Sequence, residues 1–567
     1  MKNNKYILSL ISRMTLEQKI GAVVTLGFAG TFIRPHIYEY IEKYHCSGFR
    51  LSPNSRSFGS YVDPKSGSTI VKIENTSGFK KDVPAAHMTT SQYKVILDKL
   101  QEVATKRPLG IPLHFSSDQE GGSSANLSFS GMHIFPKPMG IRATGDSQIS
   151  YEIAYALARQ CRAMGVNWLH SPTLDVNVNP DNPRTYIRAY SDKVDEVIEY
   201  AKKALQGFKD GHLMTAAKHY PGAGSSGQDP HFNLLEITTD KETMLKRDLL
   251  PYKVLSDEGL LPSVMVSHGM YPSLDDEYVS SVSKKIITGI LREELGFNGV
   301  ITTDSMTMAG VAAKYGVANA CAMSLEAGSD LVLMKAENSL VEETFNTIRD
   351  FVECGRITEK DLDEKVYRVL NLKYEYGLFT QGNVWNETPE EVSKDEKIIN
   401  LSKLVARRSV LVARNKEDAI PLAKDSKMLV IEQMNGIVND AYWHPGILYE
   451  NCLKYSKNVS YLETSYSYDK EDKENIQNTI KGHDTIVLTN FFKRGKASNT
   501  EFIEELLKDT SKTFILISNT PYRLTAPDNA KNVIVAFSSA PRSMEIAADV
   551  LFGEIIPEGE WPVDFKL

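Results

Sequence analysis

The sequence predicts a (β/α)8 barrel of the TIM type followed by a smaller α/β sandwich domain. Eight short apolar runs lie before about residue 340, and a helical pattern follows each of them. A second series of apolar runs and helical segments comes after a linker, and the 567 residues are too many for one compact core. For the first part, periodicity alone also allows a doubly wound open sheet, because that fold gives a similar alternation.

The eight apolar runs have the length of strands and end in polar residues. They cover residues 22–28, 48–51, 112–117, 166–174, 213–217, 263–266, 299–303 and 330–334. The polar residues that stand directly after several of these runs are Asp118, Asp175, Lys218, His219, His268 and Asp304. Barrel enzymes build their sites from residues at the C-terminal ends of the strands, so this pattern favours the barrel and predicts one shared site.

The domains are expected to be a catalytic barrel over residues 1–380, a linker over 381–397 and the α/β sandwich over 398–567. The linker follows a helical stretch at 359–376 and contains Gly382 and Pro389. The strands expected in the second domain are 409–412, 428–431, 484–488, 513–518 and 532–537.

Two further segments of the first domain are singled out. Residues 12–21 fit an amphipathic helix near the N-terminus. Residues 52–92, between the second and third strands, form an unusually long segment rich in Ser, Gly, Pro and Lys. This segment is either a wall of the active site that selects the leaving group or a tolerated surface insertion.

Composition points to an ordinary globular protein. With Lys+Arg 65 against Asp+Glu 72, the net charge of -7 gives no electrostatic case for nucleic acid or an anionic membrane, and no run approaches the ~20 apolar residues of a membrane span. Five scattered cysteines without a CxxC pair argue against a disulfide framework or a thiolate metal site. We therefore expect a cytoplasmic protein. Nothing in the sequence indicates the oligomeric state.

One loop carries a possible catalytic pair. The stretch HLMTAAKHYPGAGSSGQDPH, residues 212–231, begins as a buried strand and ends with Asp229 and His231. A carboxylate next to an imidazole can hold one ring nitrogen, fix the tautomer and raise the basicity of the ring. By spacing alone, a solvated loop with a chance Asp-x-His is the more ordinary interpretation.

The pattern KHYPGAG followed by DPH resembles the KHFPGHG…DSH signature of glycoside hydrolase family 3, in the branch of β-N-acetylhexosaminidases that use a His as general acid/base. Asp229 lies eleven residues after Lys218, as in that branch. Ala223 and Pro230 depart from the signature, but neither removes a proposed catalytic atom. TTDSMTMAGV at 302–311, ARRSVLVARNKEDAIPL at 406–422 and the tail at 541–563 are also similar to the family.

The resemblance implies a retaining mechanism with a nucleophile and an acid/base. The strand of the family that ends in (T/S)D-x-M supplies the nucleophile, which here is Asp304; a helix N-cap is the structural alternative for this residue. The acid/base is His231, paired with Asp229. An imidazole titrates near ~6.5 when unperturbed, so it can be protonated to assist departure and neutral to activate water.

Six further residues are expected to hold the sugar. Asp118 in DQEGG, Arg188 in NPRTYIRAYS, and the pair Lys218 and His219 match sugar-binding residues of the family, and the position of His268 and Asp175 at strand ends adds these two. Most of them have a structural alternative. Asp118 could cap a turn, Arg188 could form a salt bridge in the barrel wall, Lys218 could belong to a structural ion pair, and Asp175 could be structural.

Asn126 is a departure that bears on the substrate. In this branch of the family an Arg stands eight residues after the Asp of DQEGG, and here Asn126 takes that place. The neutral amide of Asn typically makes weaker hydrogen bonds than the charged guanidinium of Arg. The terminal sugar is therefore held by other groups, or differs from N-acetylglucosamine.

The expected function is that of a retaining, exo-acting β-N-acetylhexosaminidase for short chitin-type or peptidoglycan-derived sugars. A carbohydrate is the only expected partner, with neither a metal nor an organic cofactor; His219, His231 and His268 could in principle hold a metal, but Lys218 beside His219 argues against a cation. One alternative is a glycoside phosphorylase that passes the glycosyl group to phosphate. Another is a non-catalytic sugar-binding protein that has kept the barrel.

Overall fold

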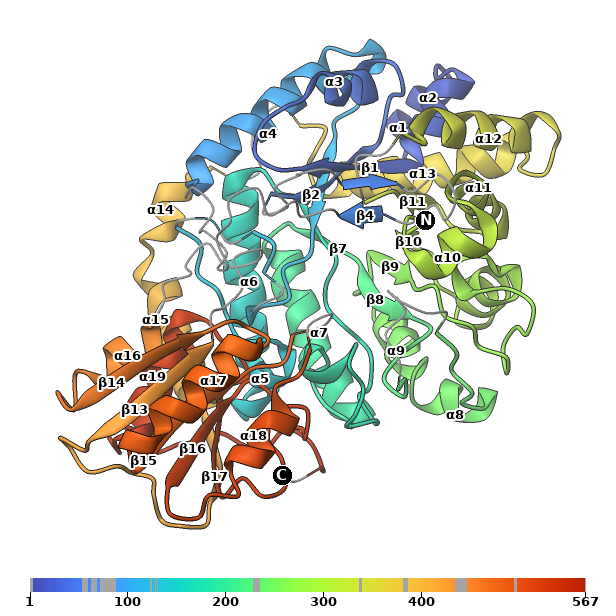
Figure 1. Ribbon diagram of the computed structural model, residues 1–567. Helices are drawn as coiled ribbons and strands as arrows, with labels where there is room; N and C mark the ends of the chain where they lie inside the picture. Colours follow the sequence, from blue (N-terminus) through green and yellow to red (C-terminus); the bar gives the residue numbers. More distant parts are fainter. Residues whose placement is uncertain are drawn as a thin grey trace.

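The computed structural model describes residues 4–53, 88–122, 125–127, 129, 131–227, 235–335, 339–380, 386–433, 446–493 and 497–565, with the backbone of 60–62 and 69–71. Figure 1 shows a barrel in blue to yellow and a second domain in orange and red beside it. Each domain is built around its own β-sheet.

The first sheet is a closed parallel barrel. Its strands follow the order β7-β6-β5-β2-β1-β11-β10-β9-β8, and every pairing between neighbours is parallel. β7 and β8 are one run of chain interrupted at Ala216, so the two ends of the order meet and eight strands close on themselves. The strands are β1 (Val24–Ala29), β2 (Gly48–Ser52), β5 (His114–Ser117), β6 (Trp168–Leu169), β7 (Met214–Thr215), β8 (Ala217–Tyr220), β9 (Ser263–Val266), β10 (Val300–Ser305) and β11 (Leu331–Leu333).

This closure confirms the predicted (β/α)8 barrel and excludes the open sheet. Each of the eight predicted apolar runs contains a strand, because a strand with a helix layer outside and a packed core inside is buried on both faces. The helices of this domain, in chain order, are α3 (Pro35–Glu42), α4 (Thr90–Thr105), α5 (Pro138–Ala143), α6 (Ser147–Met164), α7 (Val194–Asp210), α8 (Lys241–Lys246), α9 (Leu250–Asp257), the π-helix η5 (Lys285–Glu294), α10 (Ala309–Tyr315), α11 (Val317–Ala327), α12 (Val341–Glu353) and α13 (Glu359–Glu375).

The N-terminal helix predicted over residues 12–21 is wrong in its bounds. Two short helices occupy this region, α1 (Lys5–Ile11) and α2 (Leu16–Ala22). The Asn4 side chain caps α1, and Thr15 forms a capping box with Gln18 that starts α2. A capping box satisfies two backbone N–H groups at a helix start, so α2 begins after Thr15 rather than at residue 12.

The second sheet has six strands in the order β12-β17-β16-β15-β13-β14, and only β12 pairs antiparallel with its neighbour. The strands are β12 (Leu411–Asn415), β13 (Met428–Gln433), β14 (Val459–Thr464), β15 (Thr485–Asn490), β16 (Thr513–Ser518) and β17 (Asn532–Val535). Five of them were predicted. β14 was missed because it is an edge strand whose residues are mostly half-exposed, so it lacks a strong apolar run.

Helices cover both faces of the second sheet, which makes it a sandwich. Alternate residues of β13 point to opposite faces: Leu429 and Ile431 join one hydrophobic cluster, and Met428 and Val430 join the other. Side chains of α17 (Lys470–Thr479) and α18 (Thr500–Leu506) contribute to the first cluster, and those of α15 (Glu396–Ser409), α16 (Ile447–Cys452) and α19 (Pro541–Leu551) contribute to the second.

The sandwich packs against the barrel. Tyr186 of the barrel contacts Phe492 of the sandwich edge to face, at 5.2 Å between ring centroids, and Asn177 Nδ2 donates to the Tyr522 hydroxyl at 2.9 Å. The chain between the domains includes α14 (Pro389–Ser393), and Arg159 of α6 holds it through Asp395 at 2.6 Å.

Most of the long segment at 52–92 lies outside the described residues. Within it, the backbone shows an antiparallel pair of strands, β3 (Ser60–Val62) and β4 (Thr69–Val71), and α4 begins at Thr90. Among the helices that the structure describes, none has the length and apolar character required to cross a membrane.

Candidate active site

Six predicted site residues lie at the same end of the barrel. They are Asp118 after β5, Asp175 after β6, Lys218 and His219 in β8, His268 after β9 and Asp304 in β10. The C-terminal ends of parallel strands open onto one face, so strands far apart in sequence contribute to one site. Arg188 joins them from a short 3-10 helix, η3 (Tyr186–Arg188).

Asp118 is held by three basic side chains. Lys218 Nζ donates to Oδ1 at 2.8 Å, the guanidinium of Arg50 donates to Oδ2, and His170 Nδ1 lies 3.6 Å from Oδ1. Burial alone would raise the pKa of the Asp118 carboxyl, but Arg50 and Lys218 outweigh this effect and hold the pKa well below its usual range. The side chain is 27% exposed, so an ionised carboxylate is open to sugar hydroxyls.

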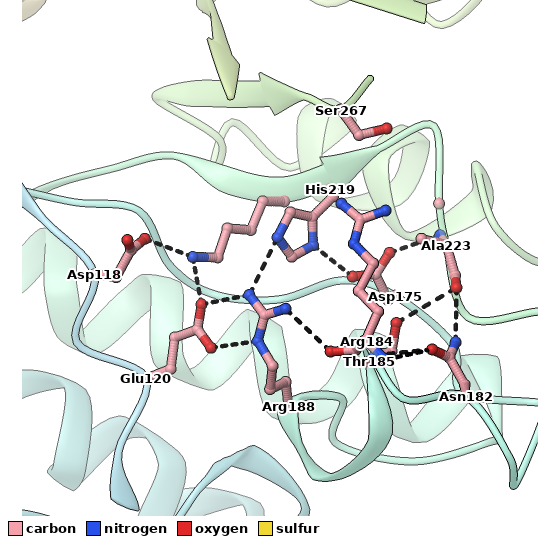
Figure 2. Close-up of polar contacts among 12 residues, drawn as sticks. Asp118, Glu120, Asp175, Asn182, Arg184, Thr185, Arg188, His219, Ala223 and Ser267 are labelled. Atoms are coloured by element: carbon pink, nitrogen blue, oxygen red, sulfur yellow. Dashed lines mark hydrogen bonds and ion pairs between the residues drawn. The ribbon is translucent and has the colours of Figure 1, made fainter. Parts of the chain in front are cut away.

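Glu120 is the centre of the polar network (Figure 2). Arg188 donates from Nε to Oε2 at 2.6 Å and from Nη2 to Oε1 at 2.8 Å, and Lys218 pairs with Oε1. Lys218 therefore bridges Asp118 and Glu120. The ion pairs expected as structural alternatives for Arg188 and Lys218 are present, and they fix both cations beside the carboxylate that faces solvent.

His219 is hydrogen-bonded at both ring nitrogens. Nδ1 lies 2.7 Å from Asp175 Oδ2, and Nε2 lies 3.2 Å from Arg188 Nη2. A guanidinium can only donate, so Nε2 accepts, and Nδ1 carries the ring proton and donates a hydrogen bond to Asp175. Burial lowers the pKa of His219 to about 4, with the charge of Arg184 as the next cause, so the ring is neutral at neutral pH.

Asp175 and Arg184 are two buried charges whose fields both act on His219. Asp175 is fully buried, and its Oδ1 accepts from the Ala223 amide at 2.8 Å. Burial would raise the pKa of Asp175, but His219 and then Arg184 lower it below its usual value. The side chain of Arg184 is 1% exposed, and within the described part of the chain its Nε and Nη1 have no hydrogen-bond partner. This environment supports the structural alternative for Asp175.

The loop after β8 is fixed at Ala223. The Ala223 carbonyl accepts from Asn182 Nδ2 at 2.8 Å, while its amide binds Asp175. A side chain at Gly224 would meet the Val176 carbonyl, because its Cβ would lie 1.7 Å from that oxygen. This anchored loop leads toward Asp229 and His231, which both lie outside the described residues, so their pairing stays a prediction.

Asp304 lies inside β10 and not at the start of a helix. The next helix, α10, begins at Ala309 with Met308 as its N-cap, so the helix-cap alternative for Asp304 is wrong. Asp304 is the one partly exposed residue of β10, and the register between β10 and β11 shifts between Thr302 and Ser305. Such a bulge redirects a side chain at a barrel rim.

His268 binds the backbone next to Asp304. Its Nε2 lies 2.9 Å from the Ser305 carbonyl oxygen, and its Nδ1 lies 2.8 Å from Ser281 Oγ. These contacts suit a residue that orients the end of β10. β9 connects this part of the site to β8, because Ser267 donates its amide to the Tyr220 carbonyl at 2.9 Å; Figure 2 shows Ser267 above the network.

Four residues of the network were missed by the sequence reasoning. Glu120 stands two residues after Asp118 in the DQEGG motif that was already singled out, and Arg50 is a cation inside a predicted buried strand, so both had a signal. His170 had the same signal, because it lies inside the predicted run 166–174. Arg184 had none, because an Arg in a loop is unremarkable without its neighbours. Position 126 does adjoin Asp118, because the backbone N–H of Asn126 donates to the backbone carbonyl oxygen of Asp118 at 3.2 Å.

The arrangement suits the recognition of a neutral, hydroxyl-rich ligand. It offers an ionised acceptor, charged donors that are already paired, and a further carboxylate, Asp304, on β10, which lies across the barrel rim from β5. Within the described ranges, no group of three or more His, Cys, Asp or Glu side chains has the geometry of a metal site.

Sequence comparisons find curated relatives of this chain. Beta-hexosaminidase A from Pseudoalteromonas piscicida is 28% identical over 304 residues, which are 50% of this chain and 51% of that protein. Beta-N-acetylglucosaminidase/beta-glucosidase from Cellulomonas fimi is 28% identical over 361 residues, 62% of each. The chain thus spans about half to three fifths of the length of these curated relatives.

Solved structures match over nearly the whole chain. The glycoside hydrolase family 3 beta-N-acetylglucosaminidase from Paenibacillus sp. str. FPU-7 has a TM-score of 0.84 and 25% identity, and covers 97% of this chain and 99% of its own. The beta-glucoside phosphorylase BglX, at 20% identity and a TM-score of 0.80, shares the fold. The family model Glycosyl hydrolase family 3 N terminal domain matches residues 73–372, which is more than half of the chain. The chain belongs to glycosyl hydrolase family 3.

Proposed function

We propose that the protein is a retaining, exo-acting β-N-acetylhexosaminidase that cleaves short chitin-type or peptidoglycan-derived sugars. The observation that carries this proposal is the ionised Asp118 carboxylate, held by Arg50 and Lys218 at the same barrel rim as Asp304. It provides a binding point for hydroxyls of a terminal sugar, and a second carboxylate stands across the barrel rim on β10. The names of the beta-hexosaminidase and beta-N-acetylglucosaminidase relatives support this substrate class.

In the proposed first step, a carboxylate oxygen of Asp304 forms a bond to the anomeric carbon as the glycosidic C–O bond breaks. The imidazolium of His231 gives its proton to the departing oxygen. In the second step, the neutral imidazole takes a proton from water, the water oxygen bonds to the anomeric carbon, and the Asp304 carboxylate is released. Asp229 holds the ring of His231, and two displacements give net retention.

Binding of the sugar is assigned to the network around Glu120. The exposed edge of Asp118 accepts hydrogen bonds from hydroxyls remote from the anomeric carbon, while Lys218 and Arg188 donate to sugar oxygens without leaving Glu120. The neutral ring of His219, fixed by Asp175, sets the position of Arg188. His268 is proposed to orient the Asp304 end of β10.

The test is a screen of 4-nitrophenyl β-glycosides of N-acetylglucosamine, N-acetylgalactosamine, glucose and xylose, each with and without phosphate. We expect turnover of the N-acetylglucosaminide, release of free sugar with retained configuration by NMR, and a rate independent of phosphate. Release of sugar 1-phosphate and a rate that rises with phosphate would establish a phosphorylase instead. Saturable sugar binding without any turnover would establish a non-catalytic sugar-binding protein.

A cytoplasmic location belongs to the same proposal. All five cysteines are free, and four of them are buried, as suits a reducing compartment. Fractionation of cells that express the native gene, followed by immunoblotting of each fraction, tests this location.

A further inference from the structure

Arg50 is an unusual residue for its place in the barrel. It lies in the middle of β2, between Gly27 of β1 and Ser116 of β5, and its side chain is 1% exposed. Central strands of parallel barrels are normally Val-, Ile- or Leu-rich, and a buried guanidinium destabilises the fold unless good partners compensate for its loss of water. The hydrogen-bond partners of Arg50 therefore indicate which role this buried charge has in the protein.

Those partners connect the end of β2 to Asp118. Nη2 of Arg50 donates to Asp118 Oδ2, while Nη1 donates to the Leu51 carbonyl and to Ser52 Oγ, the latter at 3.1 Å. A guanidinium is planar and rigid, so anchoring one nitrogen to β2 fixes the direction of the other. Arg50 thus restricts the orientation of the Asp118 carboxylate, because its own guanidinium is fixed to the end of β2.

The Asp118 carboxylate is consequently held from two sides. Arg50 binds Oδ2 from β2, and Lys218 binds Oδ1 from β8 at 2.8 Å. Rotation of the carboxylate about its Cβ–Cγ bond would break both charge-assisted hydrogen bonds. The lone pairs left for a ligand therefore point in fixed directions.

We propose that Arg50 is a positioning residue that sets the sugar specificity of the site by locking the Asp118 carboxylate. This inference rests on the proposed function, in which Asp118 accepts hydrogen bonds from hydroxyls remote from the anomeric carbon. In chitin-type sugars the C4 hydroxyl is equatorial, and a fixed acceptor distinguishes it from the axial hydroxyl of the C4 epimer. A carboxylate that could rotate would follow either hydroxyl and lose the distinction.

Arg107 offers a matched control. Its side chain is also buried, and its guanidinium donates to the carbonyls of Cys46, at 3.1 Å, and Ile111, at 2.6 Å. Cys46 stands before the first residue of β2, so Arg107 lies at the opposite end of the barrel from Asp118. Arg107→Met removes another buried guanidinium and leaves the Asp118 contacts in place.

The experiment compares wild type, Arg50→Met and Arg107→Met on 4-nitrophenyl β-N-acetylglucosaminide and its C4 epimer, the β-N-acetylgalactosaminide. Loss of a well-placed hydrogen bond to a charged group corresponds to about 10- to 100-fold in kcat/KM. We expect Arg50→Met to narrow the ratio of kcat/KM between the epimers by about 10-fold or more, chiefly through a higher KM for the glucosaminide. Arg107→Met is expected to lower the Tm and keep the wild-type ratio.

Ser52→Ala is a milder second variant in case Arg50→Met does not fold. It removes only the hydroxyl that holds Nη1, and we expect it to narrow the ratio by about 2- to 5-fold, a fraction of the effect of removing the whole guanidinium. An unchanged ratio in folded Arg50→Met, or in Ser52→Ala where Arg50→Met is unfolded, would overturn the role of Arg50 and leave the proposed function standing. Wild type that cleaves neither sugar would instead overturn the proposed function, and this inference with it.

Discussion

The Arg188 guanidinium and the Glu120 carboxylate form a bidentate ion pair, with Nε–Oε2 and Nη2–Oε1 distances of 2.6 and 2.8 Å. Both side chains are buried, and Lys218 shares Oε1 of the same carboxylate. Burial would raise the pKa of Glu120, but Arg188 and Lys218 outweigh it and hold the pKa well below its usual range. Glu120 therefore keeps two buried cations together at the proposed sugar site.

Glu120→Gln is expected to weaken both stability and binding. Removing one charge from a buried ionic network leaves the remaining cations unpaired, which typically costs about 3 to 5 kcal/mol in the free energy of unfolding. Because Arg188 and Lys218 also move apart, KM for the aryl glycoside should rise by about 10-fold or more. Urea denaturation and steady-state kinetics measure the two effects.

Asp330→Asn is the matched control for this variant. Asp330 is equally buried, pairs with Arg368 at 3.0 Å and also with Arg292, and stands at the N-terminal end of β11. We expect a comparable loss of stability with KM within about twofold of wild type, since this network is remote from the site. A wild-type KM in Glu120→Gln would contradict the binding role of the network.

His219 should make the folded state sensitive to acid. Its pKa falls from an ordinary value near ~6.5 in the unfolded chain to about 4 in the folded protein. Between these values the unfolded chain binds a proton that the folded protein does not, so stability falls as the pH falls from about 6.5 to about 4. This single group should cost about 2 kcal/mol at pH 5 relative to pH 8.

His219→Asn should flatten that part of the pH dependence, because an amide does not titrate but can still donate to Asp175. The measurement is the free energy of unfolding in urea at several pH values between 4 and 8. His212→Asn is the control: His212 is exposed and has a φ of 51°, a conformation that Asn tolerates well, so the wild-type slope should remain. A steep slope that persists in His219→Asn would contradict the assignment.

Asp304→Asn should abolish turnover with little change in sugar binding. An amide oxygen is a poor nucleophile, so kcat should fall by about 10³-fold or more, while a product sugar should bind with a Kd within about threefold of wild type. A 5-fluoro glycoside, which slows the second step, should label Asp304 in wild type, as peptide mass mapping would show. A label on another carboxylate would contradict the nucleophile assignment.

His231→Ala should reveal the leaving-group dependence of acid catalysis. Acid assistance is typically worth about 10² to 10⁴ in rate, and a departing sugar needs it much more than a departing 2,4-dinitrophenolate. We therefore expect kcat/KM to fall by about 10²-fold or more for a chitin-type disaccharide and by less than about 10-fold for the dinitrophenyl glycoside. Equal losses on both substrates would assign the proton transfer elsewhere.

The sequence by itself determined the architecture of the first domain and the positions of its strand-end residues. A strand with packing on both faces must be apolar throughout, and this local requirement is visible in a run such as 263–266 or 299–303. Each strand is followed by a helix that returns the chain to the start of the next parallel strand, so the residues after the strands all lie at one rim. This is why Asp118, Lys218 and Asp304 could be selected before any contact was known. Where local burial is incomplete, as in β14, the same reasoning missed the strand.

Only the tertiary structure decided which charges pair. Arg50 and Asp118 are separated by 68 residues, as are Glu120 and Arg188, and Lys218 lies 100 residues from Asp118. Each pair exists because the fold brings strands and the segments after them to the same rim and removes the side chains from water. The strength and direction of an ionic contact depend on that geometry and burial, and a one-dimensional pattern of residues contains neither.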